Sequence, residues 1–212
     1  MYKKQVREDH YSFKTYLPLE RWISYYHQIQ NIMKIKYSIN KRNLKILVIG
    51  VGDNIVPKAL SELGLSVKTL DLDKSLKPDY IQVLPQINIS EKFDFILCSQ
   101  VLEHVEFADA EKSIQKFSGI CNYLIVSVPN RSISFSISIK LWFFDAKKLM
   151  LSVMNPFRFQ VKKDGQHYWE IGDGIHTKNS VIDIADSSGF DCQNEYRINE
   201  FPYHHFFVFK KI

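Results

Sequence analysis

The sequence predicts an α/β domain in which a mostly parallel sheet carries helices on both faces. One observation is a short apolar run, Ile46 to Ile49, that leads directly into Gly50 and Gly52 and then into a helical pattern. The other is the alternation of strand-like and helix-like segments along residues 45–130. Such an alternation is typical of a parallel sheet covered on both sides.

The chain is long enough for one domain of this kind with its own core. It has 212 residues, of which 45% are hydrophobic and 24% charged, and these proportions indicate a globular chain. The first residues contain no apolar h-region, so we expect no signal peptide. No run approaches the roughly 20 apolar residues of a membrane span. Three scattered cysteines, Cys98, Cys121 and Cys192, indicate reduced thiols in a cytoplasmic protein.

The elements follow one another in a regular order. An amphipathic helix is expected from Leu19 to Met33, after Pro18, which suits a first helical turn. A second helix runs from the glycines to about Leu63, with Gly64 as its C-terminal cap. Two more helices are expected, along 107–117 and 180–188. The expected strands are 46–49, 66–71, 79–84, 93–98, 123–128, 190–197 and 203–210.

Residues 131–165 interrupt this order and are too long for an ordinary loop. After a stretch in which Ser alternates with Ile or Phe, a short helix is expected from Asp145 to Met154. The net charge of +5 is uneven, because residues 1–45 carry +7, residues 131–163 carry +6 and the remainder carries −8. We interpret 131–165 as a basic, apolar lid. The alternative is that both basic segments only cap the sheet edge with solvated lysines.

Asp71 ends the second expected strand, about twenty residues after the glycines, where nucleotide-binding α/β folds place a carboxylate for two ribose hydroxyls. A carboxylate suits this role because it accepts hydrogen bonds without donating any. The glycines before it allow a ligand to approach the backbone, and the next helix offers free N–H groups. We favour the ribose role over a simple turn.

Together these blocks resemble a class I S-adenosylmethionine-dependent methyltransferase, of the type 11-like kind. The resemblance rests on Ile49-Gly50-Val51-Gly52, on Asp71, and on the run from Phe93 to His104 that ends in Val-Leu-Glu-His. It implies a Rossmann-like, seven-stranded, mostly parallel sheet that closes with an antiparallel C-terminal hairpin. It also implies one methyltransferase domain over residues 1–212. Its parts are a helical extension (1–44), the cofactor-binding core (45–130), the insertion (131–165) and the C-terminal part of the sheet (166–212).

The resemblance further implies S-adenosylmethionine as the cofactor. Four residues of the glycine loop are assigned to it: Gly50, Gly52, Asp53 and Asn54. The two glycines line its methionine part, while Asp71 accepts the ribose hydroxyls and Leu72 packs on the adenine. Ser99 and Gln100, after the fourth strand, face its sulfonium side.

A methyl group on sulfonium is already activated, so alignment supplies much of the rate and a base is needed only where the acceptor must lose a proton. His104, His167 and His204 are the candidates for such a base. Each is equally well explained as a histidine that only packs or hydrogen-bonds locally. The spacing of His, Cys and Asp residues predicts no dedicated metal site.

We expect a small-molecule or a lipid- or glycan-type acceptor. Ser99-Gln100-Val101-Leu102 lacks the Asn/Asp-Pro-Pro-aromatic motif that is common in methyltransferases of nucleic-acid base amines, so nucleic acid is the less favoured partner. The basic segments would still suit RNA phosphates, peripheral contact with an anionic membrane surface, or an anionic acceptor. The oligomeric state is left open.

The alternatives are a non-catalytic methyltransferase-like module, acting as a binding or regulatory protein, and an RNA methyltransferase. Val48 stands where the family usually has an acidic residue, and Gln82-Val83-Leu84 offers no carboxylate after the third strand. An NAD-binding protein is a weaker interpretation, because a third glycine is missing from the loop.

Overall fold

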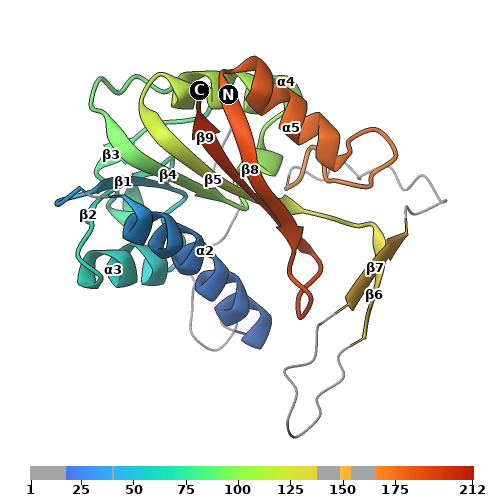
Figure 1. Ribbon diagram of the computed structural model, residues 1–212. Coiled ribbons are helices and arrows are strands. Elements are labelled where there is room, and N and C mark those ends of the chain that lie inside the picture. Colours follow the sequence, from blue (N-terminus) through green and yellow to red (C-terminus); the bar gives the residue numbers. More distant parts are fainter. Residues whose placement is uncertain (1–17, 40, 138–148, 154–165) are drawn as a thin grey trace, which may run out of the picture.

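The structure is a computed structural model that describes residues 18–39, 41–137, 149–153 and 166–212 (Figure 1). Its centre is a seven-stranded sheet with the order β3-β2-β1-β4-β5-β9-β8. The strands are β1 (Lys45–Ile49), β2 (Ser66–Asp71), β3 (Tyr80–Ile81), β4 (Phe93–Ser99), β5 (Cys121–Pro129), β8 (Phe190–Arg197) and β9 (His204–Lys211).

Strand direction follows from the connections. The pairs β1–β2, β1–β4, β2–β3 and β4–β5 are parallel, and helices or long segments connect these strands. A short loop joins β8 to β9, so these two strands pair antiparallel, as does β9 with β5. The expected fold class, with its antiparallel C-terminal hairpin, is confirmed.

The third strand is shorter than the expected 79–84. Only Tyr80 and Ile81 pair with β2. After Ile81 the chain enters a turn, in which the N–H of Gln86 donates to the carbonyl of Val83 at 2.7 Å. The side-chain amide of Gln82 spans this turn: its nitrogen donates to the carbonyl of Asn88 at 3.2 Å and its oxygen accepts from the N–H of Asn88 at 2.9 Å. A single 3₁₀ turn, η1 (Lys74–Leu76), stands between β2 and β3.

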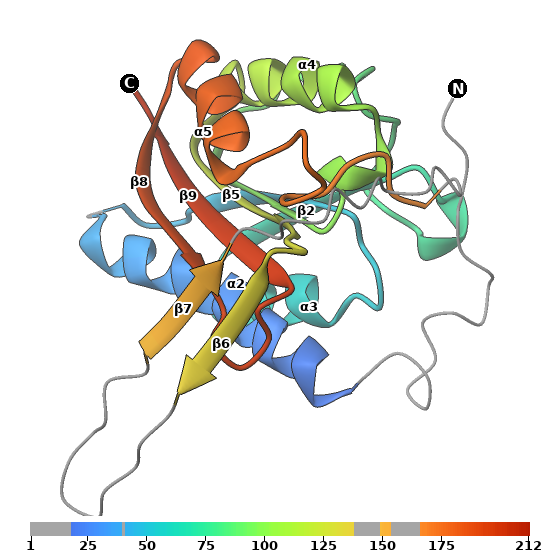
Figure 2. The same cartoon turned by 90° about the vertical axis from the view of Figure 1, so that its right-hand side faces the viewer.

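Helices cover both faces of the sheet, as Figure 2 shows. On one face lie α2 (Leu19–Ser38) and α3 (Ile55–Glu62), and on the other lie α4 (Phe107–Ser118) and α5 (Lys178–Ser187). Each pair of helices buries its own apolar cluster against the sheet. Gly64, with φ +82°, follows the end of α3 as expected. Helix α5 begins with a capping box between Thr177 and Ser180.

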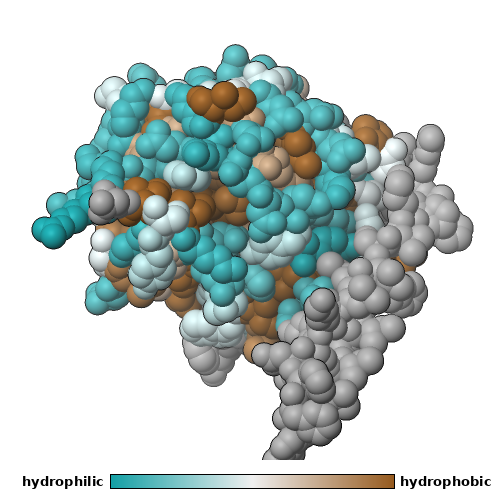
Figure 3. Space-filling view, in the orientation of Figure 1, coloured by the Kyte–Doolittle hydropathy of each residue, from teal (hydrophilic) through white to brown (hydrophobic). Residues whose placement is uncertain are grey.

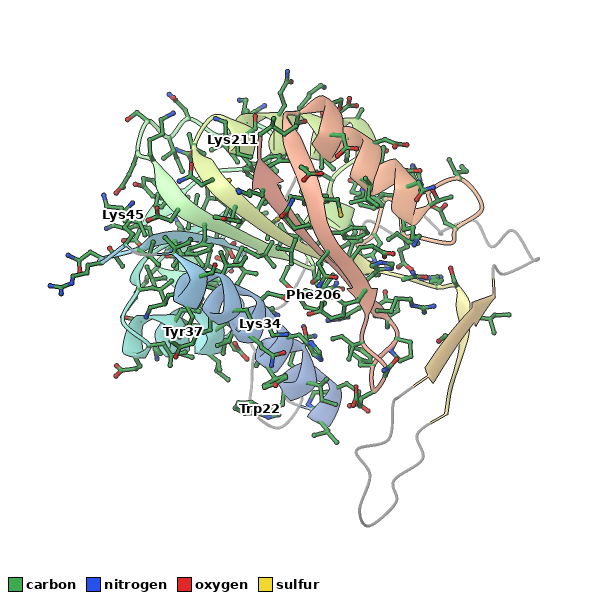
Figure 4. All side chains as sticks on the ribbon, viewed as in Figure 1. Trp22, Lys34, Tyr37, Lys45, Phe206 and Lys211 are labelled. Atoms are coloured by element: carbon green, nitrogen blue, oxygen red, sulfur yellow. The ribbon has the colours of Figure 1, made fainter. Side chains whose placement is uncertain are left out.

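Helix α2 is integrated into the domain rather than appended to it. Phe206 of β9 faces it in Figure 4, with its ring centre 6.0 Å from that of His27. Asn31 donates a 2.9 Å hydrogen bond to the hydroxyl of Tyr196 on β8. These contacts fix the helix on the sheet, whereas Trp22 and Tyr37 of the same helix are exposed (Figure 4).

The insertion contains a two-stranded ribbon, β6 (Ile133–Ile137) and β7 (Leu149–Val153), which stands away from the main sheet (Figure 1). The expected helix from Asp145 to Met154 is therefore wrong over Leu149–Val153, and its other residues lie outside the described ones. Antiparallel pairing with β6 satisfies the backbone there, and such tertiary pairing overrides local helix propensity.

The face seen in Figure 3 is mostly hydrophilic, with hydrophobic residues in separate patches. No helix in the described ranges is long and apolar enough to cross a membrane. All three cysteines are free, and Cys98 and Cys121 are buried, which confirms that they are core thiols.

Candidate functional site

A cavity of about 650 Å³ opens at the carboxyl ends of β1, β2 and β4. Open α/β sheets bind ligands at this edge, and the volume lies in the range of small-molecule sites. Nearly all residues that the sequence assigned to a site line it: Gly50, Gly52, Asp53, Asp71, Leu72, Ser99, Gln100, His104, His167 and His204. Asn54 is not among its lining residues, although it belongs to the same loop.

The glycine loop needs its glycines for two reasons. Gly50 has φ +82°, and a Cβ built on it would lie 2.6 Å from Cγ2 of Val101, so neither its backbone nor its surroundings admit a side chain. Asn54, where a third glycine is common, is also left-handed, with φ 64°. Asparagine tolerates that conformation better than most residues, and here it opens α3.

Asp71 holds the loop from the end of β2. Its Oδ2 accepts a hydrogen bond of 2.8 Å from the backbone N–H of Val51, and its Oδ1 accepts one of 2.8 Å from that of Asp73. Burial raises the pKa of Asp71 above its usual value, although these two hydrogen bonds act to lower it. Each carboxylate oxygen has a second acceptor position, so the side chain can still receive two hydroxyl groups.

Helix α2 closes the cavity on the side of the glycine loop. Arg21, Tyr25 and Gln28 are among the lining residues. Tyr25 is buried and donates a 2.6 Å hydrogen bond to Oδ2 of Asp53, whose Oδ1 accepts from the N–H of Ile55. The contribution of this helix to the cavity could not be predicted from the sequence, because an amphipathic pattern does not show what a buried helix face contacts.

The end of β4 turns sharply into the cavity. Gln100 has φ 55°, which is uncommon for a residue with a side chain. Ser127 on β5 holds this turn, because its carbonyl accepts from the N–H of Gln100 at 2.8 Å and its hydroxyl lies 2.6 Å from that of Ser99. Both side chains therefore stay fixed beside the cavity.

The three candidate histidines occupy different environments. His204 is buried at the start of β9, with Nδ1 at 2.8 Å from the hydroxyl of Ser24. Burial lowers its pKa to about 3, so it is neutral and a weak base. His104 and His167 lie together, with ring centres 4.9 Å apart. Burial lowers the pKa of His104. Burial also lowers that of His167, but the hydrogen bond to Glu170 and the negative charges of Glu103 and Glu170 together outweigh it, so the net shift is upward.

Glu103 completes a cluster with these two histidines. Its side chain is fully buried, lines the cavity, and has no hydrogen-bond partner among the described residues for either carboxylate oxygen. Burial raises its pKa to about 8. One ligand-type atom from each of Glu103, His104 and His167 lies within 4.8 Å of the other two. Both histidines were predicted from the sequence as site residues, whereas Glu103, which stands next to His104, was not.

Glu170 supports the cluster through a hydrogen bond to His167. This buried carboxylate accepts hydrogen bonds from Nδ1 of His167 at 2.6 Å, from the hydroxyl of Tyr203 at 3.1 Å and from the guanidinium of Arg131. Burial raises its pKa, but the bonds from His167 and Arg131 outweigh this effect and the net shift is downward. Glu170 is thus a charged anchor that orients His167.

Comparison with known proteins gives matches only at the level of structure. No protein-family model matches the chain, and no curated protein matches its sequence. A methyltransferase from Clostridium acetobutylicum, described as S-adenosylmethionine-dependent, superposes with a TM-score of 0.61 at 10% identity, covering 96% of both chains.

Two other solved structures contain a ligand. Magnesium protoporphyrin IX methyltransferase from Synechocystis, with bound S-adenosylmethionine, gives a TM-score of 0.61 at 13% identity, over 97% of this chain and 95% of that one. The N-methyltransferase NodS from Bradyrhizobium japonicum, with S-adenosylhomocysteine, gives 0.60 at 10% identity, over 97% and 93%. The chain therefore has the class I methyltransferase fold.

Proposed function

We propose that the protein is an S-adenosylmethionine-dependent methyltransferase. The observation that carries the proposal is the cavity at the sheet edge, where Gly50, Asp71 and Gln100 converge from three adjacent strands. The solved structures with this fold that bind S-adenosylmethionine or S-adenosylhomocysteine support the same cofactor here. These structures resemble the chain in fold alone, so S-adenosylmethionine is proposed as its cofactor on the basis of the fold and the cavity.

In this proposal each part of the cavity has a role. The bare backbone of Gly50 and Gly52 receives the methionine part, and Asp71 accepts the ribose hydroxyls with the free acceptor positions of its two oxygens. Leu72, which is partly exposed at the cavity wall, packs on the adenine. Ser99 and Gln100 face the sulfonium.

The acceptor is proposed to enter on the side of His104 and His167. Both histidines line the cavity, and both side chains are partly exposed. They follow β4 in the sequence and lie far from the glycine loop along the chain. We propose a small-molecule or a lipid- or glycan-linked acceptor, with nucleic acid as the less favoured class and a cytoplasmic location. His204 is a poor candidate for the base, because its ring is held by Ser24 and its pKa is low.

A non-catalytic binding module remains the second candidate. Val48, which lines the cavity, and the segment Gln82 to Leu84 offer no carboxylate where the family often has one. Transfer of labelled methyl groups from S-adenosylmethionine to a panel of hydroxylated and amino acceptors separates the two. Turnover that is lost in Asp71→Ala supports the enzyme, whereas cofactor binding without turnover of any acceptor supports the module.

A further inference from the structure

A buried carboxylate with nothing to satisfy it requires an explanation. Burying a carboxyl group without a hydrogen bond is costly even when it is protonated, and an ionised one is stable there only when it is paired or coordinates a metal. Glu103 is fully buried, yet the described residues give neither of its oxygens a hydrogen bond. It lines the cavity with His104 and His167, so its oxygens lie beside two imidazoles.

The hydrogen bonds of the two histidines fix which ring nitrogen is free. Nδ1 of His104 lies 2.5 Å from the carbonyl oxygen of Gln166, and a carbonyl can only accept, so Nδ1 carries the proton. Nδ1 of His167 lies 2.6 Å from the carboxylate of Glu170, which likewise accepts. In the neutral rings Nε2 is therefore unprotonated in both residues.

This is the arrangement of histidines that bind metals. A ligating histidine nearly always donates its other N–H to a carboxylate or a backbone carbonyl, which fixes the tautomer and the ring orientation. His167 has the carboxylate partner and His104 has the carbonyl partner. Glu170 is held in turn by Arg131 and Tyr203, so this outer layer is itself rigidly connected.

We propose that Glu103, His104 and His167 bind a divalent transition-metal ion, with one carboxylate oxygen and two Nε2 atoms as ligands. One ligand-type atom from each residue, a carboxylate oxygen or a ring nitrogen, lies within 4.8 Å of the other two. In a tetrahedral site with bonds of about 2.1 Å the ligand atoms are about 3.4 Å apart, so binding draws a pair at the 4.8 Å limit together by roughly 1.4 Å. This assignment replaces the expectation that the chain has no dedicated metal site.

The donor set selects the type of ion. Imidazole nitrogens suit zinc, cobalt, nickel and iron, whereas magnesium and calcium prefer oxygen ligands. Two histidines and one carboxylate thus favour zinc or cobalt over magnesium. With both Nε2 atoms engaged, His104 and His167 act as ligands rather than as general bases.

Three protein ligands leave coordination positions open, and all three residues line the cavity, so the open positions face its interior. An oxygen or nitrogen atom of the acceptor would complete the coordination, a step that rests on the proposed function. Cation binding itself does not depend on it and is tested without cofactor or acceptor.

The test uses the full-length protein, stripped of metal with a chelator. Zn²⁺ is titrated by calorimetry, and Co²⁺ is followed by its visible absorption bands. We expect one ion per chain, with magnesium at least about a hundredfold weaker. In Glu103→Gln, His104→Gln and His167→Gln the affinity falls by at least about tenfold and the cobalt bands are lost or shifted.

His176→Gln is the matched control. His176 also bonds a carboxylate three residues away, Asp173, at 2.7 Å, but it does not belong to the cluster. Circular dichroism shows whether each variant folds. If Glu103→Gln does not fold, the two histidine variants, whose side chains are only half-buried, test the proposal. The proposal is overturned by a wild-type chain without saturable binding, by equal binding in all variants, or by magnesium binding as tightly as zinc.

Discussion

The hydroxyl of Tyr25 donates a 2.6 Å hydrogen bond to the carboxylate of Asp53 and so ties helix α2 to the glycine loop. Asp53 also accepts from the N–H of Ile55 at the start of α3, so one side chain joins two helices and the loop between β1 and α3. Helix α2 is consequently a wall of the proposed cofactor cavity.

We therefore expect Tyr25→Phe to weaken S-adenosylmethionine binding about fivefold, since a single hydrogen bond contributes about 1 kcal/mol. Tyr196→Phe is the matched control, because it removes another hydroxyl that bonds α2, through Asn31, but does not line the cavity. Calorimetry with both variants checks this. Equal losses in the two would indicate that α2 acts only through overall stability.

Gly50→Ala should abolish measurable cofactor binding. The added methyl group would meet Val101 at 2.6 Å, in addition to the strain of a left-handed backbone of about 1–2 kcal/mol. Gly189→Ala separates the two effects, since Gly189 has φ +84° but no atom within 4 Å of the added Cβ. We expect a smaller loss of thermal stability in Gly189→Ala, which carries only the backbone strain, and a binding defect only in Gly50→Ala. Cofactor binding by Gly50→Ala at wild-type affinity would contradict the close approach proposed for this loop.

Replacing residues 134–152 by a Gly-Ser linker should leave cofactor affinity within about twofold of wild type, because the ribbon of β6 and β7 forms its own sheet. Arg131 stays in place and keeps its bonds to Glu170. A loss of acceptor use without a loss of cofactor binding would support the lid interpretation. Loss of cofactor affinity in calorimetry would contradict it.

Stability should fall with acid from about pH 6.5 downward. His205 is buried between Glu195 and Asn130, and burial lowers its pKa to about 4, despite the 2.5 Å bond to Glu195. As the pH falls, the histidine of the unfolded chain, with a pKa of about 6.5, is protonated before that of the folded chain. The stabilisation from the neutral His205 is therefore fully present above pH 6.5 and is lost as the pH falls toward 4. One such group changes the free energy of unfolding by about 3 kcal/mol.

Urea unfolding between pH 7 and pH 5 measures this slope. His205→Gln removes the titrating ring, and Glu195 keeps its partner Lys178 in that variant. We expect a flatter pH dependence than in the wild type. His204, whose pKa burial lowers to about 3, adds to the remaining slope, and Glu103, whose pKa burial raises to about 8, opposes it. An unchanged slope would show that His205 is not buried in its neutral form.

Local patterns predicted most of the fold and the glycine side of the site. Gly50, Gly52 and Asp71 could be recognised because strand, turn and helix periods place them at one sheet edge. Tyr25 and Glu103 could not, because their roles depend on which segments pack together, and residues 103 and 167 are brought together only by the tertiary fold. The ribbon strand β7 was missed because its pairing partner, not its own pattern, decides its conformation.

The central claim is that the cavity at the ends of β1, β2 and β4 binds S-adenosylmethionine through Asp71. Calorimetric titration with S-adenosylmethionine and S-adenosylhomocysteine tests it, using wild type, Asp71→Ala and, as control, Asp79→Ala, which also removes an acceptor of a backbone N–H but lies outside the cavity. We predict micromolar binding that Asp71→Ala weakens by about ten- to a hundredfold and Asp79→Ala leaves unchanged. No binding of either ligand by the wild-type chain would contradict the claim.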